Sequence, residues 1–557
     1  VQDIVADPLK VAASHDFLPH DRIPRPVEIF QPERNNSHGF NLAERNVSRK
    51  LLSDLEEASG RLVTGKPIVG GNELPGTEEP SVNPANTSEV VGVCHLATEE
   101  HIEQALDLAI QGQVAWDRTG AAERARVLNR AADLYESHHA ELLALCVREG
   151  GKTIPDSIAE LREAVDFFRY YGAQAERHFG EPLQMPGPTG EHNSYGLRGK
   201  GVFVCISPWN FPLAIFTGQV AAALAAGNAV LAKPAAPTPL VAYRAVQLML
   251  EAGVPDDVLH FVPGSGSLIG RRAVADARVA GVVFTGSTGV AQTINQTLAQ
   301  RDGPIGTLIA ETGGQNAMFV DTSALPEQVV HDSIYSAFNS AGQRCSALRL
   351  LCVQEEIEPR TLELLTGYMD ELVIGDPKYL STDVGPAIDA PSRAVLEAHV
   401  ERMAKEARIV HRCAMPPGAD AGTFFAPTLV EIDDIRVLTE EVFGPVLHVL
   451  KFKGSELDET VAAVNATGYG LTMGLHSRID SRARGLVAAS GAGNIYINRN
   501  MIGAVVGVQP FGGRGLSGTG PKAGGPHYLQ RMGSEYTVSN NISAVGGNAS
   551  LLTLGSD

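Results

Sequence analysis

Between residues 201 and 311 the chain alternates uninterrupted apolar runs with segments of helical periodicity, and this alternation limits the fold more than any other feature. The apolar runs are GVFVCI (201–206), NAVLAK (228–233), VLHFV (258–262), GVVFTG (281–286) and GTLIAE (306–311). The helical patterns between them cover about 213–226, 238–252, 267–275 and 288–300. Continuous apolar strands separated by helices are typical of a parallel sheet that is covered on both faces. The alternation therefore predicts an α/β fold.

The flanking segments predict the rest of the organisation. Residues 1–70 are crowded with Pro, Asn and charge and are expected to form an irregular, extended arm. Helical periodicity begins after Thr98, a plausible N-cap, with Ile102, Ala105, Leu106, Ala109 and Ile110 on one face, and continues over about 121–148 and 156–178. A turn-rich stretch at 180–200 predicts a hairpin or linker, and a second α/β series covers about 316–500. Two α/β lobes in one chain predict a ligand-binding cleft between them.

Composition and charge exclude several classes of protein. The 557 residues carry 45 Lys and Arg against 64 Asp and Glu, so the net charge is 45 − 64 = −19. An acidic chain without a long basic run is not expected to bind nucleic acid or an anionic membrane surface. The uncharged stretch 201–232 is rich in alanine and contains Pro208, Asn210 and Pro212, so it predicts buried elements and no membrane span. The first residues show no secretory pattern, and the missing initiating Met suggests a piece of a longer protein.

The cysteines and histidines indicate a cytoplasmic protein without a metal site. Neither a CxxC pair nor an HExxH motif is present. Reduced, buried thiols are the expectation for most of the six cysteines, which are Cys94, Cys146, Cys205, Cys345, Cys352 and Cys413. Cys345 differs, because its FNSAGQRCSALR context is polar and cationic, which would lower the thiol pKa and favour a reactive thiolate. A structural cysteine is the alternative.

Three further features have chemical potential. The VVFTGSTGVAQTI segment (282–294) turns through Gly286 and Ser287 into a helix, as a dinucleotide-binding turn or an ordinary αβ turn would. Glu311 ends an apolar strand before two glycines, so it is either a carboxylate facing a cleft or a helix-cap residue. Asn210 lies between two prolines after a strand, where its amide either donates to a developing oxyanion or makes a turn. A thiol, a carboxylate base, an amide donor and a dinucleotide turn together suit aldehyde oxidation through a thioester.

Seven motifs strengthen this interpretation. SPWNFP, LAKP, FTGS, ETGGQN, GQRC, EEVFGP and PFGG occur in the order found in the aldehyde dehydrogenase superfamily, which the chain resembles over about residues 70–535. Within that superfamily, PERNNS, IGAVVGVQPFGG, GTGPKAGGPHYLQR and NASLLTLG resemble the L-glutamate γ-semialdehyde (1-pyrroline-5-carboxylate) dehydrogenase half of the bifunctional proline utilization A proteins. ADPLKVAASHDFLPHDRIPRP is similar to the linker that follows their proline dehydrogenase barrel. The resemblance therefore implies the second step of proline catabolism, with an upstream proline dehydrogenase domain in the full-length protein.

The resemblance also implies a domain plan. A Rossmann-like NAD-binding domain would comprise 71–179 and 201–311, and an α/β catalytic domain would comprise 312–515. Residues 1–70 would be the arm or linker. Residues 180–200 would be a β-hairpin oligomerisation flap that joins the tail (528–557) in building a homodimer, with a plain surface loop as the alternative.

Specific residues receive roles by the same resemblance. Cys345 would be the nucleophile, Asn210 and the Cys345 N–H would hold the oxyanion, and Glu311 would activate water. NAD would be bound by Ile206, Ser207, Pro208, Trp209, Lys233, Gly266, Gly286, Ser287, Glu441 and Phe443. The chain reads KPAA where the family often has KPxE, so Ala236 leaves NADP open.

The small-molecule substrate would be anchored by Gly503, Ala504 and Ser346, sandwiched by Phe211 and Phe511, and attracted by Arg344. Ordinary core packing is the alternative for the two phenylalanines. Two other functions remain open at this point. One is a dehydrogenase for another semialdehyde such as succinate semialdehyde, and the other is a catalytically silent structural protein of the same fold.

Overall fold

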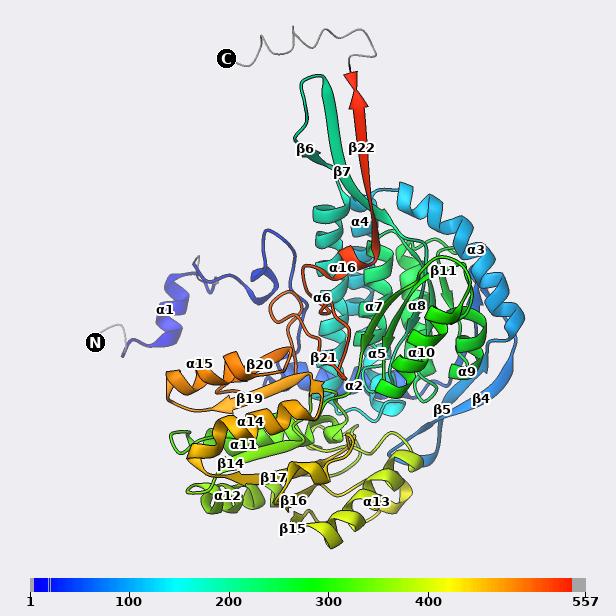
Figure 1. The fold of residues 1–557 in the computed structure, drawn as a ribbon. Helices are drawn as coiled ribbons and strands as arrows, with labels where there is room; N and C mark the ends of the chain where they lie inside the picture. The colour runs from blue at the N-terminus through cyan, green and yellow to red at the C-terminus, as the bar shows by residue number, and fades with distance from the viewer. Residues whose placement is uncertain (1–4, 19, 21, 543–557) are drawn as a thin grey trace.

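The five apolar runs between residues 201 and 311 form the parallel part of one sheet, as predicted. The computed structural model describes residues 5–18, 20 and 22–542. The runs become β8 (Val202–Ile206), β9 (Ala229–Lys233), β10 (Leu259–Phe261), β11 (Val279–Thr285) and β12 (Thr307–Glu311), shown in Figure 1. Their order is β12-β11-β8-β9-β10, and β2 (Ile68–Val69) and β3 (Asn72–Glu73) continue the sheet in antiparallel pairing. All of β9 is buried, so both faces of the sheet are covered.

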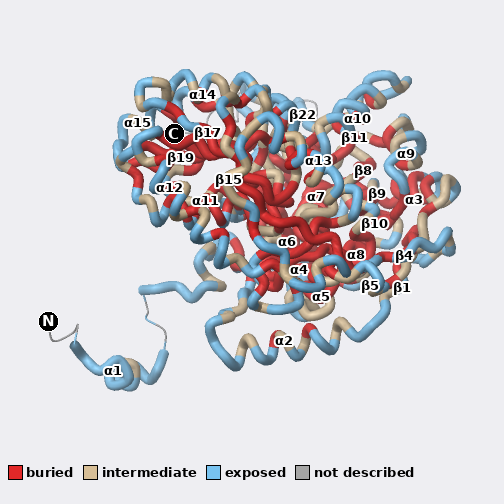
Figure 2. The backbone as a smooth tube through the Cα atoms, turned by 90° about the horizontal axis from the view of Figure 1, so that it is seen from below, coloured by how far each residue is buried: buried red, intermediate tan, exposed pale blue. Residues whose placement is uncertain are grey.

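Long helices pack around this sheet. The strands are contacted by α3 (Glu99–Arg118), α7 (Ala214–Ala225) and α8 (Pro239–Ala252), and α10 (Thr288–Gln300) follows β11. The helix α6 (Ile154–Phe179) contacts α7, α4 (Ala121–Ser137) and α5 (His139–Arg148) and lies within the most deeply buried part of the molecule (Figure 2). Thr98 caps α3 as expected, its hydroxyl accepting a hydrogen bond from the His101 N–H at 3.3 Å. Ile110 is exposed, contrary to the prediction, because it lies about 80° from Ile102 around the helix, at the edge of the apolar stripe.

A second seven-stranded sheet forms the other α/β lobe. Its order is β15-β16-β17-β14-β13-β19-β20, parallel except for β15. The strands are β13 (Ala317–Val320), β14 (Leu350–Gln354), β15 (Arg408–Arg412), β16 (Thr428–Ile432), β17 (Val446–Phe452), β19 (Thr472–His476) and β20 (Asn494–Ile497). Its helices are α11 (Pro326–Phe338), α12 (Glu358–Asp370), α13 (Ala390–Glu406), α14 (Leu457–Ala466) and α15 (Asp480–Ala489). Met318 and Val320 join one apolar cluster while Ala317 and Phe319 join another, so this sheet is also covered on both faces.

A three-stranded ribbon projects from the body of the molecule at the top of Figure 1. It consists of β6 (Leu183–Met185), β7 (Glu191–Gly199) and β22 (Gly533–Asn541), in the order β22-β7-β6 with antiparallel pairing. The turn-rich 180–200 stretch and the C-terminal segment therefore lie side by side. The NASLLTLG segment lies outside the described residues. The smaller elements are α9 (Gly266–Ile269), α16 (Tyr528–Arg531), the β1-β5-β4 sheet (Val63–Gly65, Asn86–Leu96, Thr77–Asn83) and the β18-β21 pair (Tyr469–Gly470, Arg514–Gly515).

The prediction of an irregular segment over residues 1–70 is wrong for its second half. Helix α2 spans Arg45–Ser59 and buries Leu51 and Leu55 beside α5, and β1 and β2 also fall within this segment. The apolar residues at i and i+4 carry the helical signal, which the Pro- and Asn-rich stretch before them obscures. The short helix α1 (Pro8–Ser14) is exposed and lies apart from the body (Figure 2).

Candidate active site

The predicted cofactor and catalytic residues follow the carboxyl ends of four neighbouring strands. Glu311 ends β12, Gly286 follows β11, Asn210 lies four residues after β8, and Lys233 ends β9. Because parallel strands β12-β11-β8-β9 are adjacent, these residues lie along one edge of the first sheet. Cys345 approaches this edge from the second lobe, in the loop that precedes β14.

One cavity brings the catalytic and substrate candidates together. Of the candidates, its lining includes Glu311, Cys345, Phe211, Arg344, Ser346, Gly503, Ala504 and Phe511. The remaining wall comes from α6, α7 and the segments near β11, β12 and α16, through apolar side chains such as Phe167, Phe284 and Tyr528. The cavity therefore combines a thiol and a carboxylate with largely apolar walls, a combination suited to a small aliphatic substrate.

Cys345 does not have the low pKa that its neighbours in sequence suggest. Burial, followed by the charges of Glu441 and Glu311, raises the pKa of its thiol to about 12. The nearby arginines cannot offset this effect, because Arg344 pairs with Asp156 at 3.0 Å and Arg349 pairs with Glu441 at 3.2 Å. All six cysteines are free and the other five are buried, as expected for reduced thiols.

The Cys345 loop is held in an unusual conformation. Ser340, Ala341 and Gly342 all have positive φ angles, of 53°, 53° and 65°. Arg349, which is fully buried, donates hydrogen bonds to the Gly342 and Arg344 carbonyls at 2.7 and 3.0 Å. A conformation this costly persists only when its surroundings impose it, and Arg349 supplies part of that restraint. The sequence pattern did not single out Arg349, because its partners are revealed only by the folded loop.

Glu311 is a buried carboxylate whose two oxygens differ. Oε2 accepts a hydrogen bond from the Gly513 N–H at 2.9 Å, whereas Oε1 is buried and lacks a hydrogen-bond partner in the described chain. Burial raises the pKa of this carboxyl to about 8, and the Gly513 hydrogen bond opposes the shift. A carboxylate with one free oxygen and a pKa near neutrality has the properties of a general base.

The Asn210 side chain points toward the nucleophile loop. Its Nδ2 donates to the carbonyl of Gln343, two residues before Cys345, at 3.0 Å. The backbone carbonyl of Asn210 accepts a hydrogen bond from Lys152 Nζ at 2.7 Å, and Lys152 also pairs with Glu160 at 2.7 Å. The amide is therefore held beside Cys345, while its role as an oxyanion donor stays a prediction.

Contacts join Lys233 to Phe443 through residues 206–209, and these residues define a path across the candidate cofactor site. Ile206 and Lys233 are paired across β8 and β9, and the Ser207 N–H donates to the Lys233 carbonyl at 3.1 Å. At one end the Trp209 ring meets the Phe443 ring edge-on, with centroids 5.6 Å apart, and Pro208 precedes Trp209. At the other end a second cavity, lined by Ala236 and Ser265, lies between the residues following Lys233 and those preceding Gly266.

The residues along this path and near it fit an anionic dinucleotide. Lys233 is buried, its Nζ makes no hydrogen bond or ion pair with the described residues, and burial lowers its pKa to about 8. A lysine ammonium has three N–H donors and no acceptor, so the unpaired Lys233 Nζ is free to donate to a ribose hydroxyl. The Ser287 hydroxyl caps α10, and a Cβ at Gly266 would meet nothing within 4 Å, which leaves space for close approach. Glu441 lies at the Trp209–Phe443 end through its pairing with Arg349, which stacks over Phe443 at 5.2 Å.

The substrate candidates include two features that sequence reasoning missed. Phe211 lies under two cations, with Lys152 Nζ 4.4 Å and the Arg344 guanidinium 5.2 Å from its ring centroid, so it is held by more than core packing. Asp156 balances the Arg344 charge, and this pairing weakens the predicted attraction of Arg344 for an anion. Glu163 also lines the cavity, and its carboxylate makes no hydrogen bond or ion pair with the described residues. Burial, with the charge of Glu160, raises the Glu163 pKa to about 7.

The described residues contain no group of three or more His, Cys, Asp or Glu side chains that could hold a metal ion. Within the same part of the chain, none of the helices combines the length and apolarity required to cross a bilayer.

Comparison with known proteins identifies the family. Residues 72–538 match the model of the aldehyde dehydrogenase family, and the chain belongs to this family. It is 47% identical over 546 residues to the bifunctional protein PutA of Escherichia coli K12, covering 96% of this chain and 40% of that protein. It is 37% identical to the 1-pyrroline-5-carboxylate dehydrogenase of Geobacillus kaustophilus, covering 92% and 99% of the two chains.

Solved structures of related proteins have the same fold as this chain. A crystal structure of bifunctional proline utilization A superposes with a TM-score of 0.87 and 49% identity, covering 98% of this chain and 52% of that one. A 1-pyrroline-5-carboxylate dehydrogenase mutant from Thermus thermophilus gives a TM-score of 0.86 and 31% identity, covering 94% and 99%. The chain thus spans about two fifths of the length of the PutA relatives and nearly all of the single-function dehydrogenases.

Proposed function

We propose that this chain oxidises L-glutamate γ-semialdehyde, the open form of 1-pyrroline-5-carboxylate, to L-glutamate, as the second step of proline catabolism. The observation that carries the proposal is the single cavity that joins Cys345 and Glu311 to the Gly503–Ala504 loop and to Glu163. Backbone N–H groups and Ser346 suit an α-carboxylate, while the unpaired carboxylate of Glu163 suits an α-ammonium. An amino acid aldehyde presents both groups.

The chain's own residues account for the covalent chemistry. The Cys345 thiolate adds to the aldehyde carbon, and the resulting oxyanion receives hydrogen bonds from Asn210 Nδ2 and the Cys345 N–H. NAD(P)⁺, when bound, supplies the acceptor for the hydride that leaves this carbon, so a Cys345 thioester remains. Glu311 takes a proton from water as the water oxygen adds to the thioester carbonyl. The C–S bond then breaks, which releases the acid and returns Cys345 as a thiolate.

Binding of the cofactor is assigned to the path from Lys233 to Phe443. Lys233 would donate to the adenosine ribose, Gly286 and Ser287 would receive the pyrophosphate, and Glu441 would hold the nicotinamide ribose, with the remaining contacts from Ile206, Ser207, Pro208, Trp209, Gly266 and Phe443. NAD is the proposed cofactor. NADP is the alternative, because Ala236 places no carboxylate beside the ribose to repel a 2′-phosphate.

The ribbon of β6, β7 and β22 is the proposed site of assembly. We assign residues 71–179 and 201–311 to cofactor binding, 312–515 to catalysis, and the hairpin with the tail to a homodimer interface. Leu183, Met185 and Val538 are exposed on the ribbon, where a second copy would cover them. In the full-length protein an upstream proline dehydrogenase domain would supply the substrate, and the free cysteines suit a cytoplasmic location.

The decisive test compares aldehydes and cofactors. Initial rates of cofactor reduction should be measured with glutamate semialdehyde, succinate semialdehyde and propanal, each with NAD and with NADP. We expect the highest kcat/KM with glutamate semialdehyde and NAD. A higher kcat/KM with succinate semialdehyde would establish the alternative substrate, and no reduction with any aldehyde would indicate a silent member of the fold.

A further inference from the structure

Arg34 is a buried arginine of the N-terminal segment that lies behind the candidate substrate cavity. It belongs to the PERNNS stretch, and only 7% of its surface is exposed. The guanidinium lies over the Phe30 ring at 4.0 Å. No role in the chemistry described above involves this residue, although a buried cation requires specific partners.

The first partner of Arg34 lies on α6, which forms one wall of the cavity. Arg34 Nη1 pairs with Asp166 Oδ1 at 2.9 Å. Asp166 directly precedes Phe167 and is three residues after Glu163, and both of these line the cavity. Fixing Asp166 therefore fixes the turn of α6 that presents Glu163 and Phe167 to the substrate.

The second partner lies in a different segment of the cavity lining. Arg34 Nη2 donates to the Val506 carbonyl at 2.8 Å. Val506 lines the cavity and lies two residues after Ala504, in the glycine-rich loop assigned to the substrate carboxylate. Throughout the described chain, Arg34 is the only side chain that donates a hydrogen bond to a carbonyl of residues 503–508.

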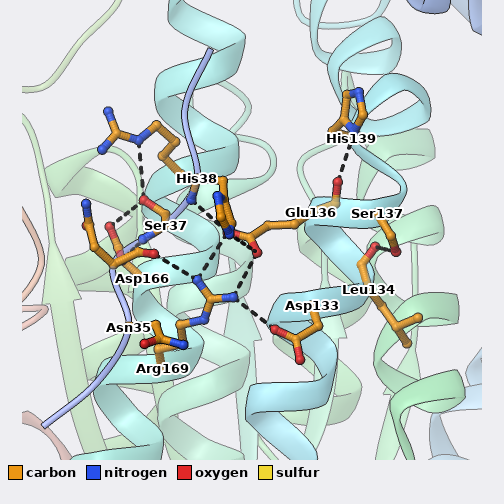
Figure 3. A network of polar contacts seen from close by, with 12 residues as sticks. Asn35, Ser37, His38, Asp133, Leu134, Glu136, Ser137, His139, Asp166 and Arg169 are labelled. Carbon is orange, nitrogen blue, oxygen red and sulfur yellow. Dashed lines mark hydrogen bonds and ion pairs between the residues drawn. The ribbon is translucent and has the colours of Figure 1, made fainter. Parts of the chain in front are cut away.

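A polar network holds the Arg34 segment in place. The Ser37 N–H and hydroxyl both donate to Asp166, at 3.0 and 2.9 Å, and the Asn36 carbonyl accepts from Arg169 at 3.1 Å. Arg169 also binds Asp133 and Glu136, and the Glu136 carboxylate accepts from the His38 N–H. Figure 3 shows this segment running alongside the helices that carry Glu136 and Asp166. Asp166 and Glu136 thus each accept from two different residues, which keeps the segment in one conformation.

We propose that Arg34 is a positioning residue for substrate recognition, because it joins the Glu163 wall and the Gly503–Val506 loop from behind. The proposal rests on the assignment of this cavity to an amino acid aldehyde. The N-terminal segment is then a part of the substrate site, although it lies more than a hundred residues before α6 and contacts no substrate. Removal of the Arg34 guanidinium would loosen the Gly503–Val506 loop and weaken binding of the charged end of the substrate. Cys345 and Glu311 would keep their positions.

Two variants and a control test the proposal. Arg34→Gln removes the ion pair with Asp166 and the charged donor to the Val506 carbonyl. Arg34→Lys keeps a cation that can pair with Asp166 but lacks the second arm of the guanidinium, which reaches Val506. Arg124→Gln is the matched control, because Arg124 is also buried and bonds to the Asp117 and Ala225 carbonyls, away from the cavity. For each protein we would measure the thermal midpoint, kcat and KM with glutamate semialdehyde and with propanal, and hydrogen exchange of residues 503–508.

We expect Arg34→Gln to raise the KM for glutamate semialdehyde on the order of ten-fold, with kcat/KM for propanal within about two-fold of wild type. Exchange of residues 503–508 should be faster than in wild type. Arg34→Lys should have a KM between those of wild type and Arg34→Gln, and it keeps the effect measurable if Arg34→Gln does not fold. Arg124→Gln should lower the thermal midpoint without changing the KM for glutamate semialdehyde or the exchange of residues 503–508. Equal losses with both aldehydes, or unchanged exchange at 503–508 in both Arg34 variants, would overturn the proposal. A wild-type chain inactive on glutamate semialdehyde would instead overturn the proposed function, and the exchange data would still decide the role of Arg34.

Discussion

Cys345 and Glu311 illustrate how burial, more than neighbours in sequence, sets the chemistry of a side chain. Both line one cavity, and burial raises the pKa of each, to about 12 for the thiol and about 8 for the carboxyl. The resting thiol is therefore protonated near neutral pH. Formation of the thiolate requires a change in its surroundings, which the arrival of substrate and cofactor can provide by altering solvation and charge.

Replacing Cys345 by alanine should abolish aldehyde oxidation. The proposed covalent intermediate cannot form without the thiol, so we expect turnover to fall by more than about a thousand-fold. Cofactor binding, followed by fluorescence titration, should be retained because the Lys233–Phe443 path is untouched. Cys205→Ala, at a buried cysteine of β8, is the control and should stay active. Substantial turnover by Cys345→Ala would refute the nucleophile assignment.

Glu311 should determine the pH dependence of thioester hydrolysis. A general base acts in its deprotonated form, and a pKa raised to about 8 leaves most of this carboxyl protonated at pH 7. Steady-state turnover should therefore rise with pH through about 8. Glu311→Gln should lose this limb and show a burst of about one reduced cofactor per site, followed by slow turnover. An absent burst with an unchanged steady-state rate would count against the assigned role.

A buried pair of histidines joins helix α13 to strand β17 in the second lobe. His399 on α13 and His448 on β17 are buried, with their Nε2 atoms 2.9 Å apart, and His448 Nδ1 lies 2.9 Å from the Arg349 carbonyl. A carbonyl only accepts, so His448 Nδ1–H is the donor to Arg349 and His448 Nε2 accepts from His399. Through Arg349, this pair supports the loop that carries Cys345.

The histidine pair should make the protein sensitive to acid. Burial lowers the pKa of His399 to about 4 and of His448 to about 3, and the Arg402 charge acts in the same direction on both, opposed at His399 by Glu406. Between these values and the ordinary 6.5 the unfolded chain binds more protons, so stability falls as the pH falls through this range. Thermal midpoints measured from pH 7 to about pH 4 should decrease less steeply in His399→Leu/His448→Leu than in wild type. Parallel profiles for the two proteins would contradict this assignment.

At the scale of the whole molecule, the ribbon of β6, β7 and β22 favours association with a second copy of the chain. It projects from the body, its edge strands are open, and Leu183, Met185 and Val538 are exposed along it (Figure 1). A second copy that pairs in two-fold symmetry would satisfy the backbone groups of both edges. The dimer follows from these features as a proposal.

Deleting residues 183–197 should convert the dimer to a monomer with weakened activity, as measured by sedimentation. The double variant Leu183→Asp/Val538→Asp provides a milder test, because it leaves the strand pairing intact and places charge on the exposed apolar surface. Tyr195→Phe, which removes a hydrogen bond to Glu535 within one ribbon, should remain dimeric. A wild-type chain that sediments as a monomer at low micromolar concentration would contradict the proposal.

Local pattern was sufficient to predict most elements of this protein and to select its candidate reactive side chains. The apolar runs 201–206 to 306–311 and the intervening helices were predictable, because strand and helix periods appear directly in the residue order. The motifs and the resemblance that they carry also named Cys345, Glu311 and the substrate candidates, and the structure places them around one cavity, while their roles stay predictions. The helix α2 was missed, since its signal is short and follows an irregular stretch.

The environment of each side chain was decided only by the tertiary structure. The sequence shows Arg344 beside Cys345, but burial of the thiol and the charges of Glu441 and Glu311 outweigh Arg344, so the thiol pKa rises where the local context predicted a fall. Likewise Arg34 meets Asp166 and Val506 across 132 and 472 residues of chain, and no periodicity encodes such contacts. Desolvation and charge pairing depend on which segments the fold brings together. Sequence therefore determined what groups this chain contains and in which elements, and tertiary packing determined their charge, partners and orientation.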